Sequence, residues 1–528
     1  MISIARKFLP IALAALPAIG QTPAPIPANA DAKLMPNRCP ANPPIGDLAS
    51  KPSWNGWGAG ISNSRMQSAA AAKLSDAQIL NLKLKWAFGF PGANAVYGQP
   101  TVVAGRVFVG VDSGYVYSLD AATGCVYWSF KADDGVRSAV SVGKSNRPGE
   151  TLAYFGDLKA NVYAVNATTG AQVWKVHMDP HPAARVTGAT QLFEDKLYVP
   201  VASLEEVSAV DPNYQCCTFR GSVAALDAFT GRKIWQTYII PDTPKPAGKN
   251  AKGTQLLAPS GAGVWNAPTI DPKRRAVYIG TGDAYSAPAA KTTDSIMALA
   301  LDTGKVLWSV QDTPNDAWVV ACLRDTKENC PKDAGPDYDF GSSPMLVDLR
   351  NSKSLLICAQ KSGYVYAHDP DQKGKLIWKT ANFSKPPEAT GQTVWGGTTD
   401  NSAAYFGLNS GGIVSLALDN GERRWFSDIK PAEGRKGGHD AAISSIPGYV
   451  VSGGWDGVLR ILSARDGKVV WSFDMAKEFK TVNGITAKGG SMGSAGPTIA
   501  DGMIFAGAGY PGVQNGVNGN VLLAFAAQ

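Results

Sequence analysis

Short apolar runs alternate with turns rich in Gly, Asp and Asn along almost the whole chain. The first clear copy of this pattern is PTVVAGRVFVGVDSGYVYSLDAATGCVYW, from Pro100 to Trp128. Its alternating Val, Phe, Tyr and Leu positions are typical of strands that bury one or both faces. The Gly-containing turns between the runs favour antiparallel hairpins. The pattern therefore predicts a four-stranded antiparallel sheet as the repeating unit.

A tryptophan closes a short turn-and-strand phrase in most copies, as in AATGCVYW and LDTGKVLW. Each phrase has its Gly where a hairpin turn requires a positive φ. Successive tryptophans are 42, 46, 61, 73, 70, 47 and 46 residues apart. The shorter spacings match the ~40–45 residues of one propeller blade, and the longer ones leave room for inserted loops. The tryptophans are Trp86, which lacks the turn, and Trp128, Trp174, Trp235, Trp308, Trp378, Trp425 and Trp471.

The two ends of the repeat complement each other. The last copy, PTIADGMIFAGAGY…GNVLLAFAAQ, supplies three strands and stops before any tryptophan, whereas no three strands precede the Trp86 strand. Pairing these segments would complete one blade and remove both free sheet edges. We therefore predict an all-β fold, an eight-bladed β-propeller over residues 52–528, closed by an N-terminal strand that joins the C-terminal strands.

The N-terminus has the layout of a secretory signal. Arg6 and Lys7 precede an apolar stretch that is too short to span a membrane, and small residues follow it. We assign residues 1–20 to a signal peptide, although cleavage after Ala30 also fits, and residues 21–51 to a Pro/Ala-rich arm. No later segment approaches ~18 unbroken apolar residues. The sequence thus predicts a periplasmic protein without a membrane span, in which disulfides can form.

Composition excludes several classes of function. The chain has 528 residues, and its formal charge of +7 is spread without a Lys/Arg run, which gives no case for nucleic acid. Its 4 histidines are scattered, so a zinc site or a His-based triad is disfavoured. No CxxCH motif is present, which argues against covalent haem in this chain.

Topology predicts where a site must lie. Strand direction alternates within a blade, so blade-to-blade connections and second-to-third-strand loops emerge at one end of the ring. The tight Thr-Gly turns emerge at the other end. Polar and unusual residues cluster in the first set, so a ligand site is expected over the central channel at that end.

Several longer motifs resemble a known family. They include VASLEEV, CCTFRGSVAALDAFTG, GVWNAPTIDPKRRAVYIGTGD, GPDYDFGSSPMLVDL, QKSGYVYAHD and TVNGITAKGG. From Trp54 to the C-terminus they are similar to the polyvinyl alcohol dehydrogenase group of quinoprotein alcohol dehydrogenases, and more distantly to methanol dehydrogenases. The resemblance implies pyrroloquinoline quinone (PQQ) and Ca²⁺ in the central funnel. It also implies oxidation of secondary or polymeric alcohols to ketones by hydride transfer, with a separate electron acceptor such as cytochrome c.

The resemblance also implies roles for carboxylates. Glu205, Asp283 and Asp339 are the expected Ca²⁺ ligands, since Ca²⁺ takes mostly carboxylate and carbonyl oxygens. Asp339 is in addition the expected catalytic base. Val319 follows Trp318 where methanol dehydrogenase has its base, so Asp337 and Asp316 remain alternatives. Glu206 neighbours Glu205, and because a strand would point the two oppositely, we expect only Glu205 to bind the metal.

Further residues are candidates for the cofactor. In methanol-oxidising relatives a vicinal disulfide stacks on the quinone, which makes the Cys216–Cys217 pair a candidate for the same contact. The expected cofactor-binding residues are Arg137, Thr187, Cys216, Cys217, Trp265 and Lys361, with Trp395 and Trp455 as weaker candidates for the rim. Plausible structural disulfides are Cys39–Cys125 and Cys322–Cys330, which leave Cys358 free.

A non-catalytic scaffold is the alternative function. Outer-membrane assembly propellers share the tryptophan repeat but need no carboxylate cluster, vicinal cysteines or channel cations. The presence of all three features in this chain favours the enzyme.

Overall fold

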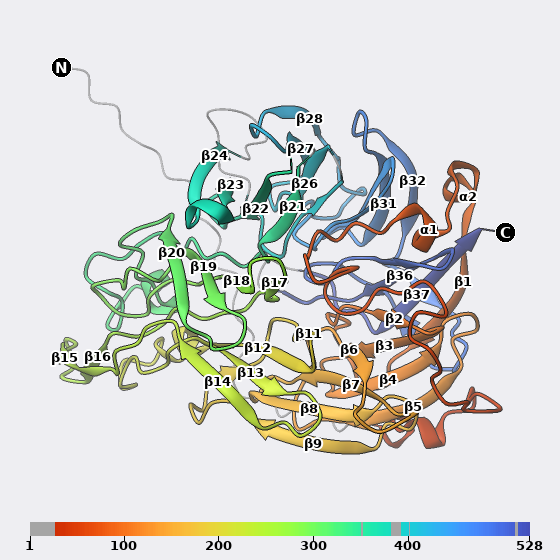
Figure 1. Cartoon of the computed structure of the whole chain (residues 1–528), viewed down its shortest axis with the longest axis horizontal. Helices are drawn as coiled ribbons and strands as arrows, with labels where there is room; N and C mark the ends of the chain where they lie inside the picture. Colours follow the sequence, from red (N-terminus) through yellow and green to blue (C-terminus); the bar gives the residue numbers. More distant parts are fainter. Residues whose placement is uncertain (1–26, 350–351, 382–391, 401, 513–515, 528) are drawn as a thin grey trace.

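The computed structural model describes residues 27–349, 352–381, 392–400, 402–512 and 516–527. The proposed signal peptide, residues 1–20, lies outside the described residues. Within them, eight antiparallel sheets stand around a common axis, seven with four strands and one with a fifth short strand (Figure 1). Innermost strands of successive blades contact one another, for example β17 with β21 and β25 with β29. The predicted eight-bladed β-propeller is confirmed.

Except in the blade that closes the ring, the strands run from inner to outer in chain order. The first three blades are β2 to β5 (Thr101–Val103, Arg106–Gly110, Tyr115–Asp120, Val126–Lys131), β6 to β9 (Ser141–Lys144, Thr151–Gly156, Asn161–Asn166, Gln172–His177) and β11 to β14 (Gln191–Phe193, Lys196–Ser203, Ser222–Asp227, Lys233–Tyr238), with β10 (Ala184–Arg185) beside β12. The next two are β17 to β20 (Thr269–Asp271, Ala276–Gly280, Ser295–Ala300, Val306–Gln311) and β21 to β24 (Met345–Asp348, Ser354–Ala359, Tyr364–Asp369, Lys375–Ala381).

The last blades complete the ring. They are β25 to β28 (Thr398–Thr399, Ala403–Gly407, Ile413–Ala417, Arg423–Ser427), β29 to β32 (Ser444–Ile446, Tyr449–Gly453, Val458–Ser463, Val469–Asp474) and β35 to β37 (Thr498–Ala500, Met503–Ala508, Val521–Ala527) with β1 (Leu82–Gly89) as the outer strand. β1 pairs antiparallel with β37, where Trp86 lies opposite Ala524. The expected closure by the N-terminal strand is therefore present, and it protects both ends of the repeat.

The tryptophan of each blade docks onto the turn of the next blade. The Trp128 indole nitrogen donates to the carbonyl of Ala167 at 3.0 Å, and Trp378 donates to that of Leu418 at 2.9 Å. A Cβ added at Gly170, in the turn that Trp128 meets, would lie 2.8 Å from its ring. The turn glycines thus serve two purposes, because their positive φ makes the hairpin and their missing side chain admits the ring.

A segment before the first blade runs along the inner strands of successive blades. Backbone atoms of residues 54–67 bond to inner strands of several blades, as in Ile270 N–H to Ile61 O and Thr399 N–H to Ser64 O. Arg65 is 1% exposed and donates from Nε to Ile443 O at 2.8 Å and from Nη2 to Ser444 Oγ at 3.0 Å. This segment ties the inner strands together, a role that the repeat pattern did not predict.

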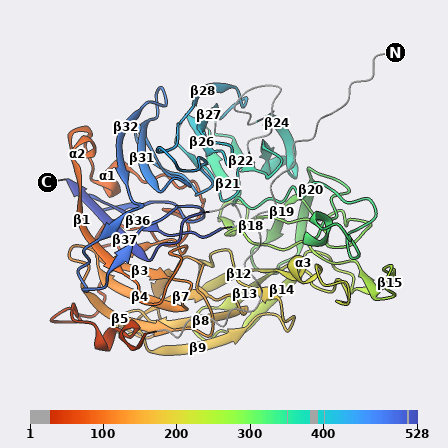
Figure 2. The ribbon, with the colours of Figure 1, turned by 180° about the vertical axis from the view of Figure 1, so that it is seen from behind.

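The remaining elements are short. In the described part of the chain the α-helices are α1 (Ala69–Ala72), α2 (Asp76–Leu80) and α3 (Glu205–Ser208), and two small hairpins are β15–β16 (Lys245–Lys249, Gln255–Ala258) and β33–β34 (Glu478–Phe479, Ala487–Lys488). Figure 2 shows α3 beside β14, on the side toward β15. Among the described residues, no helix has the length and apolarity needed to cross a lipid bilayer. Residues after Pro27 pack on the first blade, where the Cys39–Cys125 disulfide holds them.

Candidate active site

Connections from one end of the ring enclose a cavity. The cavity, as formed by the described residues, has a volume of about 290 Å³. Every lining residue comes from a blade-to-blade connection, from a second-to-third-strand loop or from the end of the strand before such a loop, which is the end that topology predicted. The lining residues are Arg137, Arg185, Thr187, Ala202, Ser203, Leu204, Glu206, Gly263, Trp265, Gly282, Asp283, Tyr285, Trp318, Asp337, Asp339, Lys361 and Trp395.

Three aspartates and one lysine form the polar centre of this cavity. One carboxylate oxygen from each of Asp283, Asp337 and Asp339 lies within 4.8 Å of the others. Lys361 Nζ is 2.7 Å from Asp337 Oδ1 and 2.7 Å from Asp339 Oδ2. The other oxygen of Asp339 accepts the backbone N–H of Asp283 at 2.6 Å. The chain thus gathers residues from three separate connections onto one small volume.

The electrostatics of the cluster favour a bound cation. Burial and the charges of Asp339 and Asp337 raise the pKa of Asp283 well above its ordinary value. Burial also raises the pKa of Asp337 to about 6, although Lys361 opposes that shift. For Lys361, burial alone lowers the pKa, but the neighbouring carboxylates outweigh it and hold the pKa above its usual range. Such shifts arise where like charges are packed together out of water.

Asp316 supports this cluster from behind instead of lining the cavity. Its carboxylate accepts the backbone N–H of Asp337 at 3.1 Å and of Tyr338 at 2.7 Å, and it is fully buried. The backbone carbonyl of Asp316 accepts the N–H of Ala284 at 3.1 Å. Asp316 therefore positions the backbone of two segments that line the cavity.

The two neighbouring glutamates of α3 have different surroundings from those expected. Glu205 is fully buried outside the cavity, where its carboxylate accepts the N–H groups of Thr218 (2.8 Å) and Phe219 (2.7 Å) and the hydroxyl of Tyr214 (2.9 Å). Glu206 lines the cavity instead, and its Oε2 has no hydrogen-bond partner among the described residues. The expectation for Glu205 is corrected, because a helical turn here, in place of a strand, aims Glu206 at the cavity.

Burial raises the pKa of Glu206 to about 7, and the charge of Asp339 adds to this effect. Glu206 is therefore a fourth carboxylate of the same electrostatic unit. The sequence indicated an acidic pair at this position, but it could not predict which of the two side chains faces the cavity, because that depends on the local backbone conformation.

The vicinal cysteines do not line the cavity. Cys216 and Cys217 form a disulfide, and both are buried in a core cluster that also contains Phe219 and Tyr285. Leu257 of the β15–β16 hairpin accepts the N–H of Cys217 and donates its own N–H to the carbonyl of Cys216. Neither cysteine is among the residues that line this cavity, where we expected them. The disulfides Cys39–Cys125 and Cys322–Cys330 are found as expected, and Cys358 is buried and unpaired among the described residues.

Two arginines line the cavity without a carboxylate partner within ion-pair distance among the described residues. The Arg137 guanidinium carbon lies 4.2 Å from the Trp395 ring centroid, and Nη2 donates to Tyr510 Oη at 2.7 Å. The Nε atoms of Arg137 and Arg185 have no partner among the described residues. Arg185 was not predicted, because a single Arg in a loop resembles any surface cation. Both charges remain available to an anionic ligand.

Aromatic side chains form one wall of the cavity. The rings of Trp265 and Trp395 meet edge to face at 5.1 Å, and Lys361 Nζ is 5.5 Å from the Trp265 centroid. Thr187 also lines the cavity, whereas Trp455 does not and instead packs on Tyr510. A planar ligand could lie against this wall.

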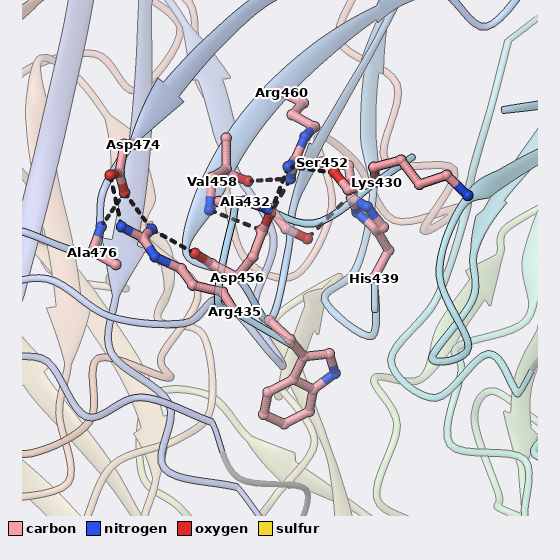
Figure 3. Close-up of polar contacts among 12 residues, drawn as sticks. Lys430, Ala432, Arg435, His439, Ser452, Asp456, Val458, Arg460, Asp474 and Ala476 are labelled. Carbon is pink, nitrogen blue, oxygen red and sulfur yellow. Dashed lines mark hydrogen bonds and ion pairs between the residues drawn. The ribbon is translucent and has the colours of Figure 1, made fainter. Parts of the chain in front are cut away.

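A second polar cluster lies in the blade β29–β32, away from the cavity lining (Figure 3). Arg435 holds Asp474 with two hydrogen bonds of 2.7 and 2.9 Å, and Asp456 forms a buried ion pair with Arg460. Burial and the Arg460 charge lower the pKa of the nearby His439 to about 4. These contacts hold the connection between β28 and β29 against its neighbouring blade, a structural role.

The donor set of the cavity fits a metal-bound quinone. Asp283 Oδ2 and Glu206 Oε2 are buried oxygens without partners in the described residues, and hard cations such as Ca²⁺ prefer oxygen ligands of this kind. PQQ is a flat tricarboxylate, which matches an aromatic wall with unpaired guanidinium groups. The chemistry of the lining residues therefore fits both groups.

Comparisons with known proteins agree with this site. A family profile described as "Glucose/ethanol/alcohol dehydrogenase, beta-propeller domain" matches residues 54–399. A second profile, for the outer membrane protein assembly factor BamB, matches residues 409–528. A polyvinyl alcohol dehydrogenase of Pseudomonas sp. is 39% identical over 94% of this chain and 81% of its own length. One of Sphingopyxis sp. is 36% identical over 92% of this chain and 78% of its own length.

Solved structures show the same fold. A quinohemoprotein alcohol dehydrogenase of Pseudomonas putida superposes with a TM-score of 0.67 at 18% identity, covering 93% of this chain and 83% of that one. A europium-containing methanol dehydrogenase gives 0.64 at 17% identity, covering 91% and 99%. The fold and the site define a PQQ-type quinoprotein dehydrogenase. The chain belongs to the PQQ-dependent alcohol dehydrogenase family, in the group that includes the polyvinyl alcohol dehydrogenases.

Proposed function

We propose that this protein oxidises secondary or polymeric alcohols, of the polyvinyl alcohol type, to ketones with PQQ and Ca²⁺. The observation that carries the proposal is the single cavity onto which Glu206, Asp283, Asp337, Asp339 and Lys361 converge. The names of the relatives support the substrate class, since the chain covers most of their length.

Glu206 and Asp283 are the proposed metal ligands, together with Asp339. Each contributes carboxylate oxygens, and two of these oxygens lack any other partner among the described residues. A dication among these carboxylates would offset the burial and the neighbouring negative charges that raise the pKa of Glu206 and of Asp283. Glu205 has no place in this ligand set, because its oxygens are taken by backbone N–H groups.

Asp339 is the proposed general base. When bound in this cavity, PQQ would supply the hydride acceptor, and a Ca²⁺ held by Glu206, Asp283 and Asp339 would supply Lewis acidity. Asp339 takes the hydroxyl proton of the alcohol, an oxygen acid too weak for an unaided carboxylate to deprotonate. Lys361 holds this carboxylate in place by its ion pair, and the backbone N–H of Asp283 holds the other oxygen.

Arg137 and Arg185 are proposed to bind the carboxylates of the cofactor, with Thr187 as a further hydrogen-bonding group. Trp265 provides the flat apolar surface for the ring system. We further propose that residues 1–20 direct the protein to the periplasm and that a separate carrier such as cytochrome c takes the electrons. The residues 21–51 then form an arm on the propeller.

Reconstitution tests the proposal directly. Apo protein should take up PQQ only together with Ca²⁺, as read from the absorbance of the bound quinone, and should then oxidise secondary alcohols with an artificial dye as acceptor. Asp339→Asn should lower the turnover by at least ~100-fold, as expected for loss of a general base. Asp337→Asn, made beside it, should retain most of the turnover. Full activity in Asp339→Asn would assign the base elsewhere, and no uptake of PQQ would overturn the function.

A further inference from the structure

Three inserted loops meet at one buried side chain beside the cavity. They are residues 209–214 after α3, the β15–β16 hairpin and the loop closed by the Cys322–Cys330 disulfide. Asn329 lies inside that last loop and is 4% exposed. Its Nδ2 donates to the carbonyl oxygens of Ala209 (3.1 Å), Asp211 (2.9 Å) and Tyr214 (3.3 Å). One amide thus fixes the backbone of the segment that follows Glu206.

A second asparagine, Asn250, connects the β15–β16 hairpin to Asn329. We call the hydrogen-bonded contact of these three loops around Asn329 and Asn250 the joint. Asn250 is 8% exposed, and its Nδ2 donates to Asn329 Oδ1 at 2.9 Å and to Pro212 O at 2.8 Å. Its own Oδ1 accepts the N–H groups of Lys252 and Thr254, each at 3.0 Å. All the amide groups of the pair are therefore satisfied inside the protein. Buried polar networks of this kind are rigid, because a lost bond leaves an unpaired group out of water.

The joint connects two of the three segments that carry the carboxylate cluster. Glu206 comes from α3, whose end is capped through Ala209, and the chain continues from Asn329 and Cys330 to Asp337 and Asp339. Of these segments, α3 also contacts the turn Val320–Leu323. The distance between Glu206 and the aspartates is thus controlled where the two loops are bonded together. Among the described residues, no hydrogen-bond partner of the Asn329 or Asn250 side chain lies in a blade strand.

We propose that Asn329, with Asn250, is a positioning pair that sets Glu206 against Asp337 and Asp339 and thereby determines how tightly the cavity holds its metal. This inference rests on the proposed function. Groups that orient metal ligands from outside the coordination sphere typically change metal affinity by about 10-fold to 100-fold when removed. Asn329→Ala should therefore weaken Ca²⁺ binding within that range while the blades stay folded.

The first test needs no cofactor. Hydrogen–deuterium exchange of the apo protein should become faster in residues 205–218, 245–258 and 322–332 together in Asn329→Ala, and remain unchanged in the blades. Asn329→Asp should do the same, because it keeps the volume but points a carboxylate at three carbonyl oxygens. Asn213→Ala is the matched control, since Asn213 lies in the same loop but is exposed and bonds locally to Asp211. Exchange that rises only within 322–332, or equally in the blades, would overturn the joint.

The second test measures binding. The apparent dissociation constant for Ca²⁺, read from the absorbance of bound PQQ, should rise by at least about 10-fold in Asn329→Ala and in Asn329→Asp. It should stay at the wild-type value in Asn213→Ala. Looser loops with Ca²⁺ affinity within about twofold of wild type would refute the positioning role. If wild-type protein takes up no PQQ, the proposed function and the positioning role both fail, while the exchange data still decide whether the joint exists.

Discussion

The ammonium group of Lys361 compensates the acidic cluster, and its removal should make protein stability depend on Ca²⁺. Lys361→Met keeps the length of the side chain but removes its charge. Nζ lies 2.7 Å from one oxygen of Asp337 and 2.7 Å from one of Asp339, and the lysine side chain is 20% exposed. Without it, three carboxylates remain within 4.8 Å of one another in a buried site.

The cost follows from these distances. At an effective dielectric constant of about 20, each ion pair is worth about 6 kcal/mol before desolvation is counted. Removing one partner of a buried pair costs about 3–5 kcal/mol net. The pKa of Asp337 is about 6 even with Lys361 present, so proton uptake reduces the cost at acid pH. We therefore expect a loss of about 3–5 kcal/mol at pH 8 without metal, and a smaller loss at pH 5.

Calcium should reverse much of this loss, because a dication replaces the missing ammonium. The assay is denaturant unfolding of wild type and variant at pH 8, with and without Ca²⁺. Lys379→Met is the matched control, since Lys379 is exposed and lies over the Tyr364 ring, and its effect should stay within about 0.5 kcal/mol. A loss in Lys361→Met that is equally large with Ca²⁺ present would refute the reasoning.

Three further predictions follow from burial and packing. Gly304→Ala should destabilise the protein by about 2–5 kcal/mol, since its Cβ would lie 2.4 Å from the docked tryptophan ring. Gly434→Ala is the control: its φ is nearly the same but its surroundings are open, so it should cost only about 1–2 kcal/mol. Equal losses of stability in the two variants would contradict the docking. Burial raises the pKa of Asp440 to about 7, so wild-type stability should fall as the pH rises from 4 to 7. Asp440→Asn should remove this pH dependence and raise the free energy of unfolding by up to about 4 kcal/mol at pH 8. A stability gain at pH 4 instead would contradict the raised pKa of Asp440. Glu206→Gln should abolish the stabilisation of the protein by Ca²⁺. Glu205→Gln should retain that stabilisation by Ca²⁺ but lower the free energy of unfolding by about 1.5–3 kcal/mol, because Glu205 accepts buried backbone N–H groups. The opposite result would restore Glu205 as the metal ligand.

Much of the fold could be predicted from the sequence, because it depends on local sequence features that repeat in each blade. The turn glycines and the tryptophans that follow them recur once per blade, and each reports the same docking contact. The partial copies at the two ends predicted the closing pair of β1 and β37. No such signal predicted the role of the segment with Trp54 and Arg65, because it has no repeat of its own and bonds to the inner strands of several blades.

The sequence by itself determined the ring, the end at which the site lies, and a set of acids and cations among which Asp283, Asp339 and Lys361 meet in one cavity. Alternation of strand direction suffices for that, because it assigns whole connections to one end. Only the tertiary structure showed that Glu206 lines the cavity, whereas Glu205 and the vicinal disulfide do not. The physical reason is that the direction of a side chain in an inserted loop depends on a few local dihedrals and on hydrogen bonds to distant loops, and no periodic pattern records either.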